Sequence, residues 1–306
     1  MSLAKRPRLL HYIEYGLARI VLAFATFAPE RLAYGLAGFL GRTFFRISKR
    51  RQAIALHHLE NAFGTTRSRK DLLRIGRVST GHVFQVVVDM VRLTRAIAAG
   101  KLLQHVVNPQ DLKFVPKPPA LIVSGHLGSW EVAGMAVASL GTPCHAIGRR
   151  FKNPLLDALV FGTREKAGLY VHPRRGGIRP VARALAEGCY GLQIVDQNQR
   201  LRGVFVPWFG EMASCERAAA TLALRRGYPI FVGACFREGT GMRYRLRASE
   251  VIHPVVTEDS EADVQRIVNE INTRLEDHVR HCPEQYLWIH DRYRTQPEAG
   301  VVEPDS

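Results

Sequence analysis

The sequence lacks the features that mark disulfide-rich, zinc-binding or nucleotide-binding proteins. Only five cysteines occur in 306 residues, and no two of them form a Cys-x-x-Cys pair. An odd, dispersed set of cysteines predicts neither a disulfide framework nor a zinc site, and it is typical of a reducing compartment. The glycines form no Walker-type loop and no Gly-x-Ser-x-Gly elbow. We therefore expect no metal, no nucleotide cofactor and no serine nucleophile.

Acidic residues are scarce relative to basic ones. The chain has 27 Asp and Glu against 43 Lys and Arg, which gives a formal net charge of +16. Such a charge attracts nucleic acid, an anionic membrane, or an acidic protein or substrate. A basic nucleic-acid-binding protein is thus the alternative from a non-enzymatic class. Charge is its only support, because no helix-turn-helix, zinc-finger or ribonucleoprotein signature accompanies it, and we expect no nucleic acid partner.

Charge-free apolar runs of membrane-spanning length are also missing. Residues 20–29 and 32–41 carry no charge, but both runs are shorter than the ~18–20 residues of a spanning helix. We expect a helical pair that lies in the membrane interface, with a buried helical hairpin as the alternative. The basic residues among 46–51 suit an anionic cytoplasmic leaflet. No cleavable signal peptide is expected, because Glu14 and Arg19 interrupt the first apolar stretch.

The hydrophobic pattern of the remaining chain predicts an α/β fold. Residues 52–100 have helical spacing, and from residue 120 strands alternate with helices. The segment 242–248 alternates as a half-exposed antiparallel strand. We expect a mixed central sheet flanked by helices. The expected strands are 120–123, 145–148, 169–172, 192–195, 203–209, 230–236 and 242–248, and the expected helices are 129–138, 154–167, 180–187, 213–226 and 264–281.

The stretch Ala120–Gly134 carries the main candidate for chemistry. A buried strand leads into a glycine-rich turn and then a helix, for which Ser129 is a plausible N-cap. This places His126 at the strand-to-helix corner and Glu131 in the first helical turn. If His126 folds back over the helix start, the carboxylate of Glu131 can hold one ring nitrogen while the other acts as a base. The alternative is a structural histidine beside a surface glutamate.

Several motifs in this order resemble those of a known family. His-Leu-Gly-Ser-Trp-Glu, at residues 126–131, is similar to the His-x4-Glu motif of the lipid A biosynthesis acyltransferases, a branch of the lysophospholipid acyltransferase superfamily. The other matching segments are Gly-Arg-Arg-Phe-Lys-Asn-Pro at 148–154, Val-Asp-Gln at 195–197, Val-Phe-Val-Pro-Trp-Phe-Gly at 204–210, and Gln-Tyr-Leu-Trp-Ile-His-Asp-Arg-Tyr at 285–293. The resemblance covers nearly the whole chain. Each motif is moderately specific, and their occurrence together in the family's order makes the resemblance strong.

Five further residues are expected to bind substrate. Arg149 and Arg150 follow a strand shortly before Asn153, where a guanidinium can clamp a phosphate. The family has an arginine of its active-site groove at the position of Arg149; a surface arginine pair is the alternative. Asp196 and Gln197 end a strand, where proteins of this class bind ligands. Asp196 can hold an arginine such as Arg149, or it can be a simple turn residue.

The resemblance implies acyl transfer from a thioester to a lipid hydroxyl. We expect His126 to take the hydroxyl proton and Glu131 to orient it, so that the oxygen attacks the thioester directly without an acyl-enzyme. Backbone amides at the helix start, or Arg149, would offset the developing oxyanion. A thioesterase that uses the same pair on water is a further alternative.

The resemblance also implies partners and a location. These are acyl carrier protein as the donor, a lipid A precursor or related glycolipid as the acceptor, and an N-terminal anchor at the cytoplasmic face of the inner membrane. Phosphoinositide mannosides, amino-acid lipids and lysophospholipids are alternative acceptors. We therefore expect an anchor over residues 1–48, a catalytic acyltransferase domain over 49–295 and a disordered tail over 296–306.

Overall fold

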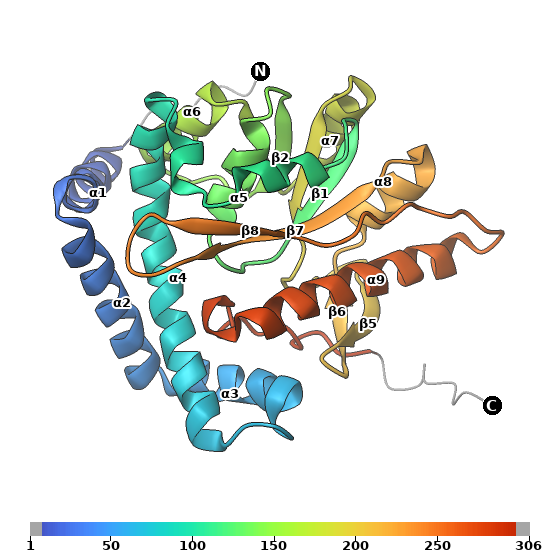
Figure 1. Cartoon of the computed structure of the whole chain (residues 1–306), viewed down its shortest axis with the longest axis horizontal. Coiled ribbons are helices and arrows are strands. Elements are labelled where there is room, and N and C mark those ends of the chain that lie inside the picture. The colour runs from blue at the N-terminus through green and yellow to red at the C-terminus, as the bar shows by residue number, and fades with distance from the viewer. Residues whose placement is uncertain (1–7, 298–306) are drawn as a thin grey trace.

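The structure is a computed structural model that describes residues 8–297, so the predicted tail lies almost entirely outside the described residues. A six-stranded sheet forms the centre of the molecule, with the order β3-β2-β4-β1-β7-β8 (Figure 1). β8 pairs antiparallel with β7, and the other pairs are parallel. The strands are β1 (Ala120–Ser124), β2 (Cys144–Gly148), β3 (Leu169–Pro173), β4 (Tyr190–Ile194), β7 (Ile230–Arg237) and β8 (Tyr244–Ala248). The predicted α/β class with a mixed central sheet is confirmed.

Helices cover both faces of this sheet. Leu121 and Val123 of β1 pack on the side of α7, α8 and α9, whereas Ala120 and Ile122 pack on the side of α5. Successive side chains of a strand point to opposite faces, so a strand buried on both sides reads as one apolar run. The helices are α5 (Trp130–Ala138), α6 (Pro154–Lys166), α7 (Ile178–Ala186), α8 (Ala218–Arg226) and α9 (Ser260–His281), with short 3-10 turns at Leu102–His105, Pro109–Phe114 and Pro283–Gln285.

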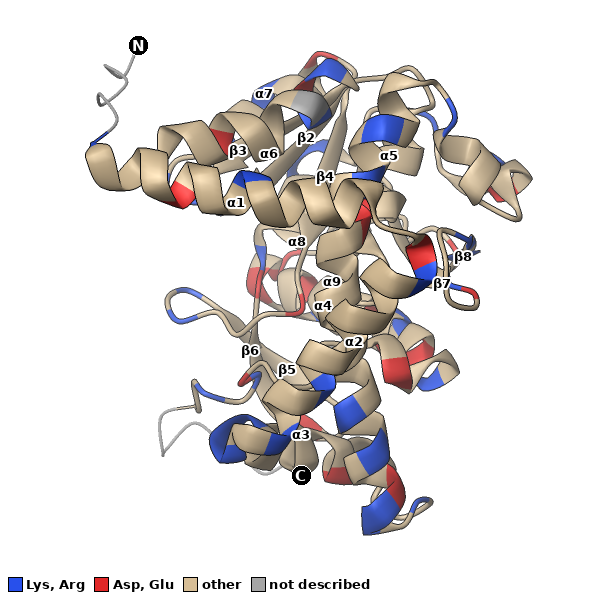
Figure 2. Ribbon diagram, turned by 90° about the vertical axis from the view of Figure 1, so that its left-hand side faces the viewer, with Lys and Arg blue, Asp and Glu red and all other residues tan. Residues whose placement is uncertain are grey.

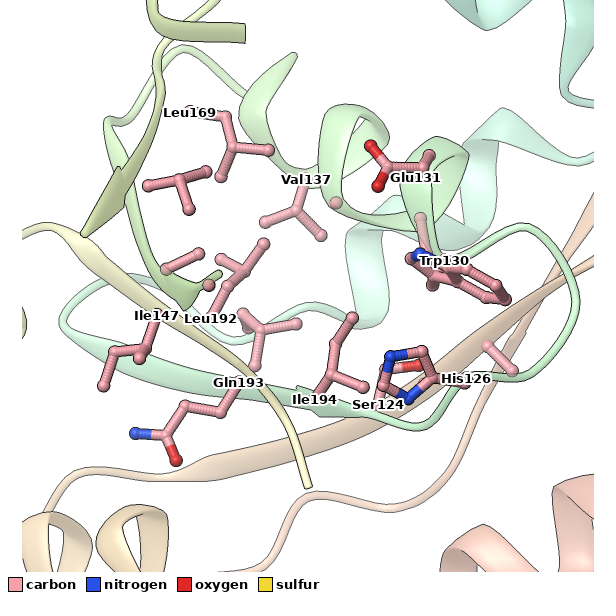
Figure 3. A pocket seen from close by; sticks show the side chains of 18 of the residues that line it. Ser124, His126, Trp130, Glu131, Val137, Ile147, Leu169, Leu192, Gln193 and Ile194 are labelled. Carbon is pink, nitrogen blue, oxygen red and sulfur yellow. The ribbon is translucent and has the colours of Figure 1, made fainter. Parts of the chain in front are cut away.

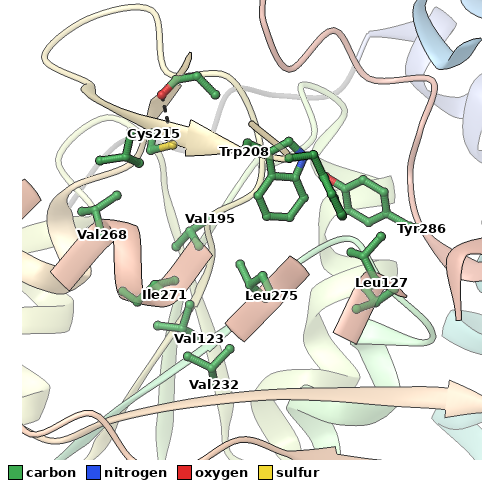
Figure 4. Close-up of a cluster of buried hydrophobic side chains, with 14 of the residues drawn as sticks. Val123, Leu127, Val195, Trp208, Cys215, Val232, Val268, Ile271, Leu275 and Tyr286 are labelled. Atoms are coloured by element: carbon green, nitrogen blue, oxygen red, sulfur yellow. Dashed lines mark hydrogen bonds between the residues drawn. The ribbon is translucent and has the colours of Figure 1, made fainter. Parts of the chain in front are cut away.

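The core between the sheet and α9 holds the central strands rigidly. Figure 4 shows side chains of three adjacent strands packed against one face of α9. These are Val123 of β1, Val232 of β7 and Val195 directly after β4, together with Val268, Ile271 and Leu275 of the helix. Each fully buried aliphatic side chain contributes about 1.5–3 kcal/mol relative to an exposed one. The carboxyl ends of β1 and β4 are therefore fixed in place.

A separate hairpin corrects one expectation. The sequence predicted a helix over 213–226, but Glu211–Cys215 forms β6, which pairs antiparallel with β5 (Val204–Trp208). The hairpin turn is Phe209-Gly210, and both residues have positive φ angles of 47° and 82°. A turn with two positive φ angles matches the twist of a two-stranded hairpin. The helix begins only at Ala218.

From residue 8 onward, four α-helices precede the sheet: α1 (Leu9–Phe27), α2 (Glu30–Ile47), α3 (Lys49–Phe63) and α4 (Arg69–Ala98). Ala25 is the only buried residue of α1. Figure 2 shows surfaces with few charges on α1 and α2, and basic residues gathered on α3 and at the start of α4. By length and composition α1 could cross a membrane, with a mean hydropathy of 1.2. The charge-free runs alone did not indicate this, because α1 includes Glu14 and Arg19.

The second helix is fixed to the body of the protein. Tyr34 and Phe45 of α2 are each 1% exposed, and α2 packs along α4. On the same helix, Leu32, Leu36, Phe39 and Leu40 are exposed. α2 thus has one face in the core and one apolar face outside it.

Candidate functional site

His126 and Asp196 lie side by side at the carboxyl ends of two neighbouring strands. β1 and β4 are adjacent and parallel, and Ser124 pairs with Ile194 in their register. His126 and Asp196 follow these paired residues by two positions each. Nδ1 of His126 is 2.7 Å from Oδ1 of Asp196, and the backbone N–H of His126 donates to Oδ2 at 2.8 Å. One carboxylate therefore fixes both the ring and the backbone of His126.

Asp196 is buried, with 2% of its surface exposed, but its environment favours the ionised form. Burial alone would raise its pKa, whereas the charge and hydrogen bonds of His126, together with the charge of Arg292, lower that pKa below its ordinary value. An ionised carboxylate accepts the proton on Nδ1, which leaves the lone pair on Nε2. Nε2 is therefore the nitrogen that can accept a proton from a substrate.

The side chain of Gln197 lies next to this nitrogen. The amide nitrogen of Gln197 is 3.4 Å from Nε2 of His126, and its amide oxygen accepts a hydrogen bond from Arg174 at 2.8 Å. Because Arg174 donates to the oxygen, the NH2 group is the end that faces His126. A substrate hydroxyl that reaches Nε2 would take the place of this amide.

Glu131 does not contact His126, which corrects the expectation for this pair. Its carboxylate instead accepts hydrogen bonds from Arg164 of α6, at 2.9 Å from Nε and 2.5 Å from the terminal nitrogen. Glu131 lies in the first turn of α5, and its side chain points towards α6 rather than back over the turn. In the structure Asp196, not Glu131, contacts the ring of His126, and Asp196 is not paired with Arg149.

Arg150 and Asn153, which were expected to bind substrate, are engaged in packing. Arg150 pairs with Asp157 at 2.5 Å, and its guanidinium lies 4.6 Å from the ring centroid of Phe161. Asn153 is 4% exposed and accepts a hydrogen bond from the backbone of α6. Its amide group donates to the backbone of α1 and to Glu14, both at 2.9 Å. Asn153 therefore fastens α1 to the start of α6.

Two arginines flank the site on adjacent strands. Gly148 pairs with Pro173 in the register of β2 and β3, so the following residues, Arg149 and Arg174, leave the sheet next to each other. Both are exposed and line the same cavity as His126. Within residues 8–297, no carboxylate lies at ion-pair distance from either side chain. Two neighbouring guanidinium groups can bind a phosphate.

A cavity of about 580 Å³ extends from His126 between the sheet and α5 and α6. His126 and Trp130 lie at one end of it, with their ring centroids 5.1 Å apart. Figure 3 shows aliphatic side chains at the opposite end, around Leu169 and Val137. The aliphatic lining includes Ile122, Val137, Val160, Leu169, Val171 and Leu192. The cavity is thus polar beside His126 and largely aliphatic at the opposite end.

A C-terminal segment, residues 283–293, supports the turn that carries His126. The N–H of Leu287 donates to the carbonyl of His126 at 3.1 Å, and the carbonyl of Gln285 accepts from the N–H of Gly128 at 2.9 Å. These bonds satisfy backbone groups that a turn would otherwise leave to water. The turn is held from a part of the chain far away in sequence.

The same segment holds the turn after Asp196. Arg292 is 1% exposed and donates to the carbonyl of Gln197 at 2.8 Å. The Nε2 of His290 accepts from the N–H of Asn198 at 3.1 Å. Sequence reasoning left His290 without a role and did not single out Arg292. The signal in the sequence that could have identified them is their position in the family motif at residues 285–293.

No group of three or more His, Cys, Asp or Glu residues in the described part of the chain is arranged to hold a metal ion. None of the cysteines lines the cavity, and Ser124, which does, donates weakly to the neighbouring Gly125 carbonyl at 3.4 Å. The chemistry available at the mouth is therefore that of an oriented imidazole with nearby guanidinium groups.

Known proteins with similar sequences are acyltransferases of bacterial lipids. The family described as "Bacterial lipid A biosynthesis acyltransferase" matches residues 3–295. A lipid A biosynthesis acyltransferase of Haemophilus influenzae is 24% identical over 90% of this chain and 86% of that protein. A lipid A biosynthesis myristoyltransferase of Escherichia coli is 24% identical over 92% and 87%. A phosphatidylinositol mannoside acyltransferase of Mycolicibacterium smegmatis is 26% identical over 56% and 57%.

Proposed function

The chain belongs to the bacterial lipid A biosynthesis acyltransferase family, and from this premise we propose that it moves a fatty acyl group from an acyl thioester to a hydroxyl of a phosphorylated glycolipid. The observation that carries the proposal is the position of His126. Its Nδ1 is held by a buried carboxylate, and its ring lies at the mouth of an apolar cavity.

His126 acts as the general base, and Asp196 orients it. As Nε2 takes the proton of the acceptor hydroxyl, the oxygen attacks the carbonyl carbon of the thioester. The C–S bond then breaks, and the thiolate leaves with the proton from the imidazolium. Asp196 stabilises that imidazolium while it exists. The absence of cysteines from the cavity lining and the local bond of Ser124 support direct transfer without an acyl-enzyme.

The substrates bind on opposite sides of His126. The apolar cavity takes the acyl chain of the donor, and Arg149 and Arg174 bind a phosphate of the acceptor at the mouth. The positive charge of Arg149 also offsets the negative charge that develops on the thioester oxygen. The donor is acyl carrier protein, since a net charge of +16 steers an acidic carrier to this surface.

The N-terminal helices keep the enzyme at the cytoplasmic face of the inner membrane. α1 exposes apolar side chains along its length and is fastened to α6 by Asn153. A helix that is fixed along the protein surface in this way suits a position in the interface better than one across the bilayer. The anchor then places the mouth of the cavity beside a lipid acceptor.

Mass spectrometry of membrane lipids tests the proposal. Cells without the gene should accumulate an underacylated glycolipid, and the wild-type gene, but not His126→Ala, should restore the missing acyl group. Unchanged lipids after deletion would overturn the proposal. A shift in an inositol mannoside, amino-acid lipid or lysophospholipid instead would identify a different acceptor, and the similarity to the phosphatidylinositol mannoside enzyme favours testing that acceptor first.

A further inference from the structure

A fully buried carboxylate on α4 reaches the turn that carries His126. We propose that Asp89 and Ser129 are positioning residues, and that the bond between them holds this turn in the geometry the base requires. The inference rests on the proposed function, because it concerns the same histidine. Ser129 follows His126 by only three residues, and its hydroxyl donates to Oδ2 of Asp89 at 2.8 Å.

Asp89 is the centre of a network that joins four separate elements. It is 0% exposed, and its two oxygens accept from four side chains. Tyr34 of α2 and Tyr244 of β8 donate to Oδ1 at 2.8 Å and 2.6 Å, and Arg237 of β7 and Ser129 donate to Oδ2. Four hydrogen bonds satisfy both oxygens of this carboxylate. Its position is therefore fixed by α4 and the sheet.

The hydroxyl of Ser129 is used for this bond instead of for capping. Ser129 precedes α5 but makes no side-chain cap bond, which corrects its expected role. Its backbone N–H donates to the carbonyl of Cys235 at 2.7 Å. The hydroxyl and the N–H of Ser129 therefore hold it to neighbouring elements, and only its carbonyl, which accepts from the N–H of Ala133 at 3.0 Å, joins it to its own helix.

A second side chain of α4 supports the same turn. His82 lies on the buried face of α4, and its Nε2 is 3.1 Å from the carbonyl oxygen of Gly128. Burial lowers the pKa of His82 to about 4, so the neutral ring donates its Nε2 proton to that carbonyl. Gly128 has a φ of +57°, and a Cβ there would lie 2.1 Å from the carbonyl of Cys235. The positive φ of Gly128 and its close approach to Cys235 thus leave the turn few alternative conformations.

Tyr34 offers a matched comparison for Ser129. Both side chains donate one hydroxyl to the same carboxylate, at the same distance of 2.8 Å, and both are at most 1% exposed. Ser129 adjoins the turn of His126, whereas Tyr34 lies on α2, and its hydroxyl donates to Asp89 and not to that turn. Ser129→Ala and Tyr34→Phe therefore remove the same kind of bond on opposite sides of Asp89. Asp89→Asn is less informative, because it would leave Arg237 buried without its counter-charge.

The test compares these two variants with wild-type full-length protein in detergent. Small misplacements of a catalytic group reduce turnover strongly. Ser129→Ala should therefore lower kcat about tenfold or more, with KM for both substrates unchanged. Tyr34→Phe should keep kcat within about twofold of wild type, while both variants lose similar stability in urea unfolding. Equal kcat values in the two variants would overturn the inference, because the bond would then be merely structural.

A second readout does not depend on activity. The Nδ1 proton shared by His126 and Asp196 should give a low-field proton NMR signal, identified by its absence from His126→Ala. Ser129→Ala should weaken or shift this signal, and Tyr34→Phe should leave it in place. An unchanged signal in Ser129→Ala would overturn the inference. If the signal responds as expected but the wild-type protein transfers no acyl group, the positioning stands and the proposed function fails.

Discussion

Gly134 is a position at which a larger side chain would grow into the proposed acyl cavity. Gly134 lies on α5, and a Cβ added there would lie 3.4 Å from Cδ2 of Leu192 and 3.7 Å from Cδ2 of Leu169. Both leucines line the cavity, so a side chain at this position would grow into the space between them. Gly134→Ala should fit at ordinary contact distance, whereas Gly134→Leu should occupy the apolar end.

The size of the effect follows from the burial of methylene groups. Leucine carries three carbons beyond Cβ, so it should exclude about three methylenes of a long acyl chain. Each excluded methylene loses about 0.8 kcal/mol of burial, which together amounts to roughly 2.4 kcal/mol. This corresponds to about a fiftyfold loss in kcat/KM for long donors, given tenfold for each 1.4 kcal/mol. Donors too short to reach Gly134 should be unaffected.

Competition between acyl donors of different length measures this directly. Mixtures of saturated donors would be offered to each variant, and the products would be quantified by mass spectrometry. Gly134→Leu should move the preferred length down by roughly three carbons. Gly162→Leu on α6 is the control, because a Cβ there would meet nothing within 4 Å. An unchanged length preference in folded Gly134→Leu would show that the acyl chain lies elsewhere.

Three further predictions concern the base, pH and the membrane. Asp196→Asn should reduce kcat at least about 10²-fold, because it removes the charge that orients the base. Glu131→Gln should mainly lower the urea midpoint of unfolding. If instead Glu131→Gln lost turnover and Asp196→Asn lost only stability, Glu131 would be the orienting group. Burial lowers the pKa of three histidines from 6.5 to about 4, so the folded state resists protonation and stability should fall as pH drops from 6.5 towards 4, by about 2 kcal/mol for each at pH 5. These are His58, His82 and His278. Equal urea midpoints at pH 7.5 and 5 would contradict that reasoning. Deletion of residues 1–27 should release protein from membranes and raise KM for the lipid acceptor more than for the donor, and continued sedimentation with membranes at high salt would refute the anchor.

The sequence predicted the components of the site better than their partners. His126 and Asp196 were both placed at strand ends, and the structure confirms this. Their contact could not be predicted, because it depends on β4 lying next to β1 although β2 and β3 intervene along the chain. Spacing alone instead suggested Glu131, which is near in sequence but turned towards α6. Local patterns reveal what a segment forms, whereas the order of strands is settled by the whole chain.

From sequence alone it was also difficult to distinguish substrate-binding polar residues from structural ones. Asn153 and Arg150 resemble ligands in sequence, because both stand close to the end of a strand. Glu14, the partner of Asn153, becomes its neighbour only when α1 packs on α6. Asp157, the partner of Arg150, lies seven residues further on in α6, and sequence alone did not show that it would hold the guanidinium. The hairpin of β5 and β6 was missed for a related reason. The small residues of Glu211–Cys215 fit a helix as well as a strand, and pairing with β5 decides between them.

The dependence of His126 on residues 283–293 gives the enzyme an order of events during synthesis. A ribosome adds residues from the N-terminus, at about 5–20 per second, so α1 and α2 emerge well before the catalytic histidine. The residues that hold this turn, Leu287 on His126 and Gln285 on Gly128, follow roughly 160 residues later, a delay on the order of 10–30 seconds. If the proposed anchor is correct, the growing chain can meet the membrane before residues 283–293 support the turn of His126. The geometry of the proposed base is then completed only after the anchor has been made.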